Sequence, residues 1–71
     1  MPTRVAAHIT GTVWKIEVKP GDRVAQGQVL LVIESMKMEM PVESPVAGTV
    51  REVLVSPEQS VAEGDALVTL D

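Results

Sequence analysis

One lysine of this 71-residue chain stands between two methionines, in the run Glu-Ser-Met-Lys-Met-Glu-Met over residues 34–40. A lysine amine can be acylated, and unbranched methionine side chains adapt to several protein surfaces. We therefore interpret Lys37 as a candidate attachment point, with Met36 and Met38 as candidate recognition residues beside it. Because most lysines are only solvated surface charges, the rest of the sequence has to support this interpretation.

The other polar and sulfur-containing residues near this lysine carry weaker signals. Met40 is closer to the body of its strand, and we expect it to fill a gap in the core. Two roles stay open for Glu34 and Glu39: they tune recognition, or they keep an exposed hairpin soluble and discourage edge pairing. His8 is the only histidine and the chain has no cysteine. We therefore expect His8 to be an ordinary surface or core residue, with no metal site and no catalytic residue in the chain.

The sequence contains two copies of one unit. Residues 11–34 align without a gap onto residues 48–71, at a constant offset of 37. The aligned identities are Gly11-Thr12-Val13 with Gly48-Thr49-Val50, Val18 with Val55, Pro20 with Pro57, Val24-Ala25 with Val61-Ala62, Gly27 with Gly64, and Leu30 with Leu67. Repeated units adopt equivalent conformations, so we predict an internal two-fold axis. The axis places Lys37 and the two chain termini at opposite ends of the molecule, because the symmetry mate of Lys37 falls just beyond either terminus.

Composition limits the possible classes of function. A chain of this length forms one small domain that buries only about 60% of its unfolded surface, so we expect one domain over residues 1–71 and no deep pocket. Nucleic acid is not an expected partner, because the net charge is −4, the basic residues are scattered and only one residue is aromatic. No apolar run is long enough for a membrane span and no signal peptide is recognisable. We expect no membrane partner and a cytoplasmic location, which the absence of cysteine permits.

Residue types predict β-structure throughout and no helix. Val, Ile and Thr dominate segments that Gly, Pro and Asp bound, which is typical of short strands. The predicted strands lie near residues 3–7, 11–18, 23–25, 29–34, 38–43, 48–55, 60–62 and 66–71. Eight short strands in two halves indicate an all-β fold, either a flattened barrel or a sandwich.

Alternation of polar and apolar residues over 13–18 predicts which way each side chain of this strand points. Trp14 is expected on the same face as Ile16 and Val18, at the edge of the core, while the two charged residues between them face solvent. Trp14 aligns with Arg51 in the second copy. We therefore interpret the indole as a packing residue rather than a ligand-binding one.

Turn signals separate the strands at equivalent points of the two copies. Residues 19–22 have Pro second and Gly third, the preference of a type II turn. The aligned residues 56–59 keep the proline but lack the glycine, which predicts a type I turn there. Residues 26–28 and 63–65, each with a central Gly, provide a second turn in each half.

Three segments resemble, in order and spacing, the motifs of the biotinyl and lipoyl attachment domains. These are VKPGDRVAQGQVL at residues 18–30, ESMKME at 34–39 and SPVAGTV at 44–50, and the resemblance covers nearly the whole chain. It implies a barrel-sandwich hybrid of two four-stranded antiparallel sheets. It also implies that Lys37 lies at the exposed tip of a hairpin, with its ε-amine acylated by a cofactor.

The residues beside the lysine resemble the biotin carriers, because lipoyl domains usually have aspartate before the lysine and alanine after it. The resemblance therefore implies covalent biotin on Lys37, delivered in activated form by a biotin protein ligase. It further implies that the biotinyl arm takes up carboxylate at a biotin carboxylase and donates it at a carboxyltransferase. The carrier itself does no chemistry, since a protonated amine is a poor nucleophile unaided and the ligase must supply the activation.

Two other functions stay open. A lipoyl carrier, or a carrier that accepts either cofactor, would use the same Lys37 for lipoate, and an unmodified scaffold would not need its amine. Some carriers of the biotin group have a protruding thumb in the first half, for which the gapless repeat leaves no room, so we expect a mobile biotin arm. The chain is either a free-standing carrier or part of a larger one, and the carboxyltransferase sets the acyl acceptor.

Overall fold

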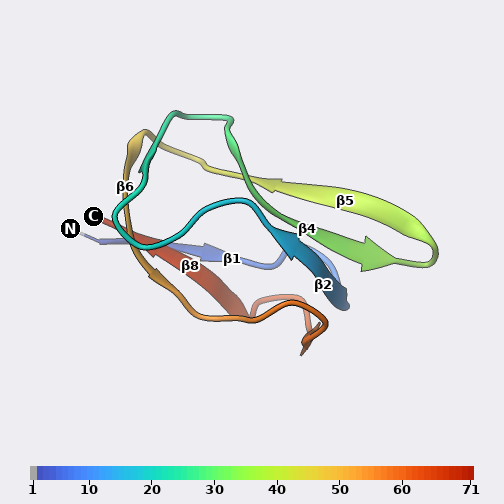
Figure 1. Ribbon diagram of the computed structural model, residues 1–71. Helices are drawn as coiled ribbons and strands as arrows, with labels where there is room; N and C mark the ends of the chain where they lie inside the picture. Colours follow the sequence, from blue (N-terminus) through green and yellow to red (C-terminus); the bar gives the residue numbers. More distant parts are fainter. Residues whose placement is uncertain (1) are drawn as a thin grey trace.

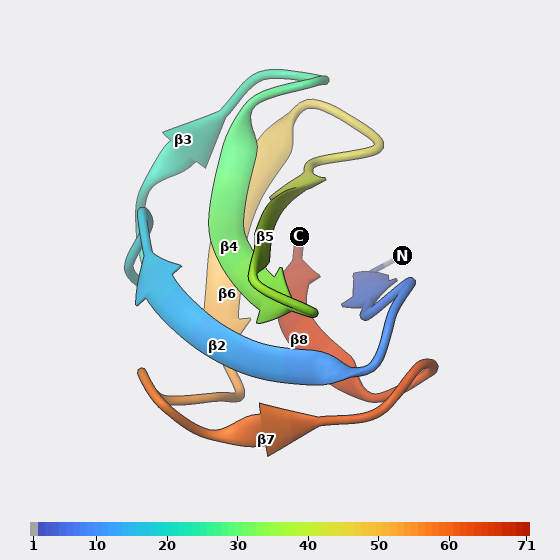
Figure 2. The ribbon, with the colours of Figure 1, turned by 90° about the vertical axis from the view of Figure 1, so that its right-hand side faces the viewer.

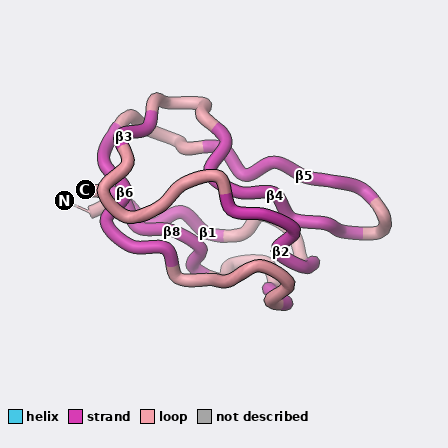
Figure 3. The backbone as a smooth tube through the Cα atoms, viewed as in Figure 1, coloured by secondary structure: helices cyan, strands magenta, loops and turns pink. Residues whose placement is uncertain are grey.

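The computed structural model describes residues 2–71 and shows eight short strands with no helix among them (Figures 1 and 3). The strands are β1 (Thr3–Ala6), β2 (Gly11–Ile16), β3 (Arg23–Val24), β4 (Val29–Ser35), β5 (Met38–Glu43), β6 (Gly48–Val53), β7 (Ser60–Val61) and β8 (Ala66–Leu70). Every predicted strand is present, with ends within two residues of those expected. No helix in the described residues is long and apolar enough to cross a membrane.

The strands form two four-stranded antiparallel sheets, with the orders β1-β8-β6-β3 and β5-β4-β2-β7. Exchanging each strand for its counterpart four places along the chain converts one order into the other. The predicted all-β, barrel-sandwich fold with internal two-fold symmetry is therefore confirmed. Each sheet contains strands from both halves, and the two sheets curve around one another (Figure 2).

The core lies between the sheets and obeys the same symmetry. Apart from Val32, its buried residues come in pairs separated by the repeat offset: Val5 and Val42, Ala7 and Ser44, Val13 and Val50, Val18 and Val55, Val24 and Val61, Leu30 and Leu67, Leu31 and Val68, Ile33 and Leu70. Ser44 is the polar member, and its hydroxyl donates to the carbonyl of Val46. Burial of apolar area from both halves supplies the main stabilisation of a domain this small.

The orientation of Trp14 differs from the prediction. Val13 and Lys15 pair with consecutive residues of β4, so Trp14 between them is an extra residue without a partner, which defines a β-bulge. Val13 takes the fully buried position, and Trp14 is left 46% exposed. The predicted placement of Trp14 at the core edge with Ile16 and Val18 is wrong, because the bulge shifts the alternation by one residue.

A second bulge occurs at the equivalent place in the other half. Val50 and Glu52 pair with consecutive residues of β8, which leaves Arg51 without a partner. Strands β2 and β6 consequently have the same burial pattern. The bulge belongs to the repeated unit and does not depend on whether the bulged side chain is an indole or a guanidinium.

The first turn of the first half has the predicted type II character. Gly21 takes a φ of 95°, and the N–H of Asp22 donates to the carbonyl of Lys19 at 3.1 Å. The N–H of Gly21 also donates to the carbonyl of Val50 at 2.8 Å. This turn is thereby tied to a strand of the second half.

The equivalent turn over residues 56–59 has the same backbone although it lacks the glycine. Glu58 takes a φ of 72°, and its N–H donates to the carbonyl of Val13 at 2.6 Å. The predicted type I turn is wrong, because the bond to Val13 requires the amide to point as that of Gly21 does. The tertiary contact overrides the preference of L-residues for negative φ.

The second turn of each half follows the prediction. Gly27 and Gly64 take φ values of 85° and 94°, where a side chain would be strained. Main-chain hydrogen bonds of 3.1 and 3.0 Å close the two turns.

Replacing Glu58 with glycine is expected to stabilise the fold. Relief of the left-handed strain, less the extra chain entropy of glycine, should raise the free energy of unfolding by about 1 kcal/mol, measured by urea denaturation. Glu58→Ala is the control, because it removes the carboxylate and keeps the strain. A glycine variant no more stable than the alanine variant would show that the positive φ costs nothing here.

Candidate functional site

Lys37 lies at the tip of the β4–β5 hairpin, which projects from the body at the end opposite both termini (Figure 1). The molecule measures 32 × 17 × 17 Å along its principal axes. The positions predicted from the repeat for the lysine and the termini are therefore those observed.

A two-residue loop forms this tip. Ser35 pairs with Met38 across the hairpin, and between them Met36 and Lys37 take φ values of 53° and 65°. Positive φ at both central residues is the character of a type I′ turn, whose twist matches that of the flanking strands. Such turns normally contain Asn or Gly, so the tip holds two side chains in a conformation that favours neither of them.

The tip side chains face solvent. Met36 is 90% exposed and Met38 is 62% exposed, and Lys37 is exposed too. Lys15 pairs with Glu17 at 3.6 Å, but Lys37 has no ion-pair partner among residues 2–71. Two apolar side chains so open to water are available for contact with another protein.

The hairpin is attached to the body of the domain up to the start of its loop. The hydroxyl of Ser35 donates to the carbonyl of Thr10 at 2.9 Å. Met40 is half-buried and pairs with Ile33, as a residue near the strand body should. β4 also pairs with β2 as far as Glu34, so the body of the domain supports the hairpin up to its two-residue loop.

Glu34 and Glu39 lie directly opposite one another on the two strands of the hairpin, and both are exposed. Facing carboxylates destabilise a strand pair slightly, and Glu39, on the edge strand β5, discourages pairing with another chain. Both roles expected for them, in recognition and in solubility, are compatible with this position. His8 is exposed, and the described residues contain no group of three or more potential metal ligands.

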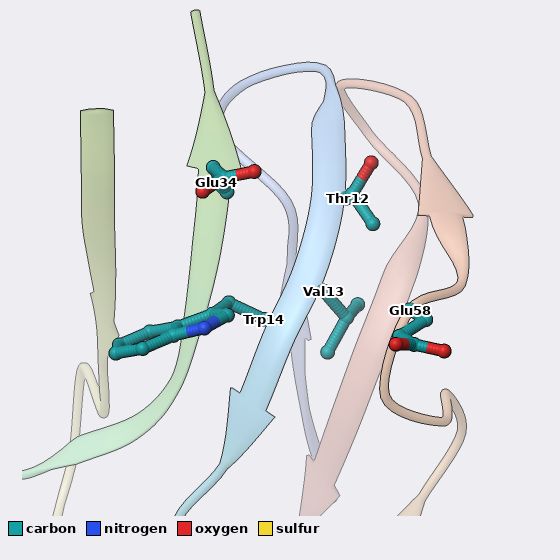
Figure 4. Close-up of a pocket in the computed structure, with 5 residues that line it drawn as sticks. All are labelled: Thr12, Val13, Trp14, Glu34 and Glu58. Carbon is teal, nitrogen blue, oxygen red and sulfur yellow. The ribbon is translucent and has the colours of Figure 1, made fainter. Parts of the chain in front are cut away.

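A surface cleft of about 450 Å³ lies next to the hairpin, and the sequence did not predict it. Thr12, Val13 and Trp14 of β2 line it together with Glu34 of β4 and Glu58 of the turn before β7 (Figure 4). The indole of Trp14 extends across β4 toward β5 (Figure 4). The sequence signal that bears on this cleft is Glu58, which stands where the other copy has Gly21. That difference alone predicted a change of turn type and not a cleft.

These features define a class of protein: a small two-fold symmetric β-domain that presents one lysine on an exposed hairpin. The family model described as "Biotin-requiring enzyme", for the biotin and lipoyl attachment domains, matches residues 2–70. The chain belongs to this family. The family match also supports covalent biotin, the cofactor expected from the sequence.

Individual proteins share parts of the sequence. The biotin/lipoyl attachment protein of Bacillus subtilis is 45% identical over 38 residues, which cover 54% of this chain and 52% of that protein. The methylmalonyl-CoA carboxyltransferase 1.3S subunit of Propionibacterium freudenreichii is 57% identical over 35 residues, covering 49% of this chain and 28% of that subunit. These matches span about half or less of the curated relatives' length.

A solved structure matches the whole chain. The urea carboxylase of Kluyveromyces lactis aligns with a TM-score of 0.95 and 30% identity, over 100% of this chain and 6% of that protein. The relatives and the structural neighbour together identify a carrier domain of the kind found in biotin-dependent carboxylases. Such a domain is non-catalytic in itself.

Relief of strain at the tip gives a second test of the geometry. Met36→Asn places a residue that tolerates positive φ at the first position of the loop, and should raise the free energy of unfolding by about 0.5 to 1 kcal/mol. Met36→Leu keeps both the strain and the apolar surface, so it should leave stability unchanged in the same urea titration. Equal stabilities for the two variants would contradict a strained loop.

Proposed function

We propose that Lys37 carries the biotin and that residues 1–71 act as one biotin carboxyl carrier domain. Loaded by a biotin protein ligase, the domain would move carboxylate from a biotin carboxylase to a carboxyltransferase of a biotin-dependent carboxylase. The observation that carries this proposal is the exposed Lys37 on a two-residue loop in a chain of the biotin-requiring family.

The geometry of the tip fits a covalently held group. The Lys37 amine is free of ion pairs within the described residues, whereas Lys19 pairs with Asp22 at 3.4 Å and Lys15 with Glu17 at 3.6 Å. The amine of Lys37 can therefore enter a ligase active site, where it forms an amide bond to the biotin carboxyl carbon. The activating group leaves as the bond forms, and the amine loses its proton to the ligase.

The chain's own residues contribute presentation. The closed loop fixes where the lysine stem begins, while the stem beyond it stays flexible, so the payload reaches into partner sites without unfolding the domain. Met36 and Met38 offer polarizable surfaces that adapt to more than one partner. Biotin, once attached, supplies the carboxylate-carrying chemistry, and no side chain near the tip has to act as acid or base.

Lipoate is the alternative payload, because a relative is described as a biotin/lipoyl attachment protein. The exposed tip would present either cofactor. The methionines on both sides of the lysine favour biotin, as the sequence resemblance implies.

The intact mass of the chain after co-expression with a biotin ligase tests the attachment. One biotinyl group on Lys37, located by peptide mapping, is expected, with Lys15 and Lys19 unmodified because neither lies at the tip of the β4–β5 hairpin. Lys37→Arg keeps the charge but cannot be acylated, so modification should vanish completely. A parallel co-expression with a lipoate ligase distinguishes the two cofactors. Modification by the lipoate ligase alone would show that the chain is a lipoyl carrier. Modification by neither ligase would favour an unmodified scaffold.

If the ligase recognises the methionines beside Lys37, replacing one of them should slow biotinylation. Met36→Asn should lower the ligase kcat/KM by about tenfold, the equivalent of roughly half the burial free energy of one methionine side chain, even though the variant is the more stable one. Met40→Leu is the matched control and should be modified at the wild-type rate. A ligase kcat/KM equal to the wild-type value for both variants would show that the ligase does not recognise Met36.

A further inference from the structure

The internal repeat allows the outer faces of the two sheets to be compared position by position. In the sheet that holds the lysine hairpin, Val32 of β4 pairs with Lys15 on one side and with Pro41 on the other. Its chain neighbours Leu31 and Ile33 belong to the core cluster and Val32 does not. Because successive residues of a strand point to opposite faces, Val32 lies on the outer face of the sheet.

Val32 is nevertheless buried, with only 8% of its surface exposed. The indole of Trp14 accounts for this burial, because it extends across β4 (Figure 4). The Nζ of Lys15, which is the cross-strand neighbour of Val32, lies 4.9 Å from the centre of the same ring. Trp14 of β2, Val32 of β4 and the exposed Pro41 of β5 therefore form an apolar row across the outer face of this sheet.

The equivalent row on the other sheet is polar. The repeat places its members, in the same order, at Arg51, Thr69 and Arg4. The chain itself satisfies both arginines: Nε of Arg51 lies 3.8 Å from Oδ1 of Asp71, and the guanidinium of Arg4 donates to the carbonyl of Gly64 at 2.9 Å. All three positions are thus apolar only on the sheet that presents the lysine, although both halves have the same fold.

The apolar row is too small for a stable contact with another protein. Specific interfaces bury about 800 Å² on each partner, whereas a half-exposed indole and a proline offer on the order of 200 Å². An area of this size suits a small ring. The ring of biotin is bicyclic and contains a thioether, and thioether sulfur makes favourable contacts with aromatic side chains.

The apolar row also lies within reach of a group on Lys37. Pro41 follows Lys37 by four residues along β5, or about 13 Å of extended strand. A lysine stem extended by a biotinyl chain spans about 14 Å from Cα to the ring. The counterpart row includes Arg51 beside Asp71, at the far end of a molecule 32 Å long, and is out of reach.

We propose that the indole of Trp14 is a resting surface for the biotin ring carried by the same chain between visits to its partners. The inference rests on the proposed function, because it requires biotin on Lys37. Lys15 leaves the ring at little cost, since its side chain and that of its ion-pair partner Glu17 are about half exposed. One indole face holds the ring only weakly, so the arm exchanges rapidly and keeps the mobility expected from the gapless repeat.

Fluorescence tests this contact, because Trp14 is the single tryptophan of a chain without tyrosine or phenylalanine. Acrylamide quenching is measured on the purified chain before and after complete biotinylation by a biotin ligase, with the product confirmed by intact mass. The quenching constant should fall about twofold on biotinylation, since a ring packed on one face of the indole excludes acrylamide from that face.

Nuclear magnetic resonance locates the contact without any catalytic assay. In a ¹⁵N-labelled chain the single indole N–H signal belongs to Trp14, and it should shift on biotinylation. Nuclear Overhauser effects are expected between the indole protons and the protons of the biotin ring.

Exchanging the bulged residues of the two halves gives the matched control. The double variant Trp14→Arg with Arg51→Trp keeps one indole but moves it to the sheet that the arm of Lys37 does not reach. Biotinylation should leave its quenching constant unchanged. Lys37→Arg with free biotin is the second control, and it should also show no change, because the ring is then not tethered.

A biotinylated wild-type chain with the quenching constant and indole signal of the unmodified chain would overturn the resting surface and leave the carrier function intact. An equal fall in quenching for the exchanged variant would also overturn it, since the shielding would then not depend on reach. So would a quenching constant that changes with protein concentration, because a second copy would then cover the indole. A wild-type chain that no ligase biotinylates would overturn the proposed function and this inference together.

Discussion

Reciprocal main-chain hydrogen bonds, among them one from each of two equivalent turns, hold the halves of this domain in register. The amide of Gly21 in the first half donates to Val50, and the amide of Glu58 in the second half donates to Val13. Val13 and Val50 are both fully or nearly fully buried, at 0% and 2% exposure. Because these bonds join the most buried strand positions to the turns of the opposite half, neither half can complete its own structure alone. The mixed strand orders of the sheets follow from the same interlocking.

The strands of the lysine hairpin contribute to the core, but the loop that closes them lies outside it, with Met36 90% exposed. The symmetry mate of this hairpin within the described residues is the β1–β8 pair, in which Thr3 lies opposite Leu70. Strands β4 and β5 continue past the body until the loop at Met36 and Lys37 closes them. In the described residues the β4–β5 hairpin thus projects from the symmetric body and presents the lysine (Figure 1).

Much of this architecture could be predicted from the sequence, because the repeat restricts both halves at once. The strand positions, the glycine turns and the placement of Lys37 opposite the termini all followed from local signals in matching places. Two predictions failed for reasons that a single strand cannot reveal. The orientation of Trp14 depends on a bulge in the pairing with β4, and the conformation of Glu58 depends on a hydrogen bond to Val13 in the other half. Both are long-range contacts, and both override local preference.

Those two residues also line the cleft, and the reason connects fold with function. In a duplicated domain, positions where the copies agree are accounted for by the shared fold, as with Thr12 and Thr49. At positions where the two copies differ, the shared fold does not determine the residue, or another requirement does. A bulged side chain such as Trp14 points outward in both copies, so the fold accepts an indole or a guanidinium there equally. Glu58 is different, because the fold itself favours glycine at that turn and the chain nevertheless retains the acid. The positive φ of Glu58 follows from the hydrogen bond between its main-chain N–H and the carbonyl of Val13, so the backbone of this turn is set by the fold and its side chain is not.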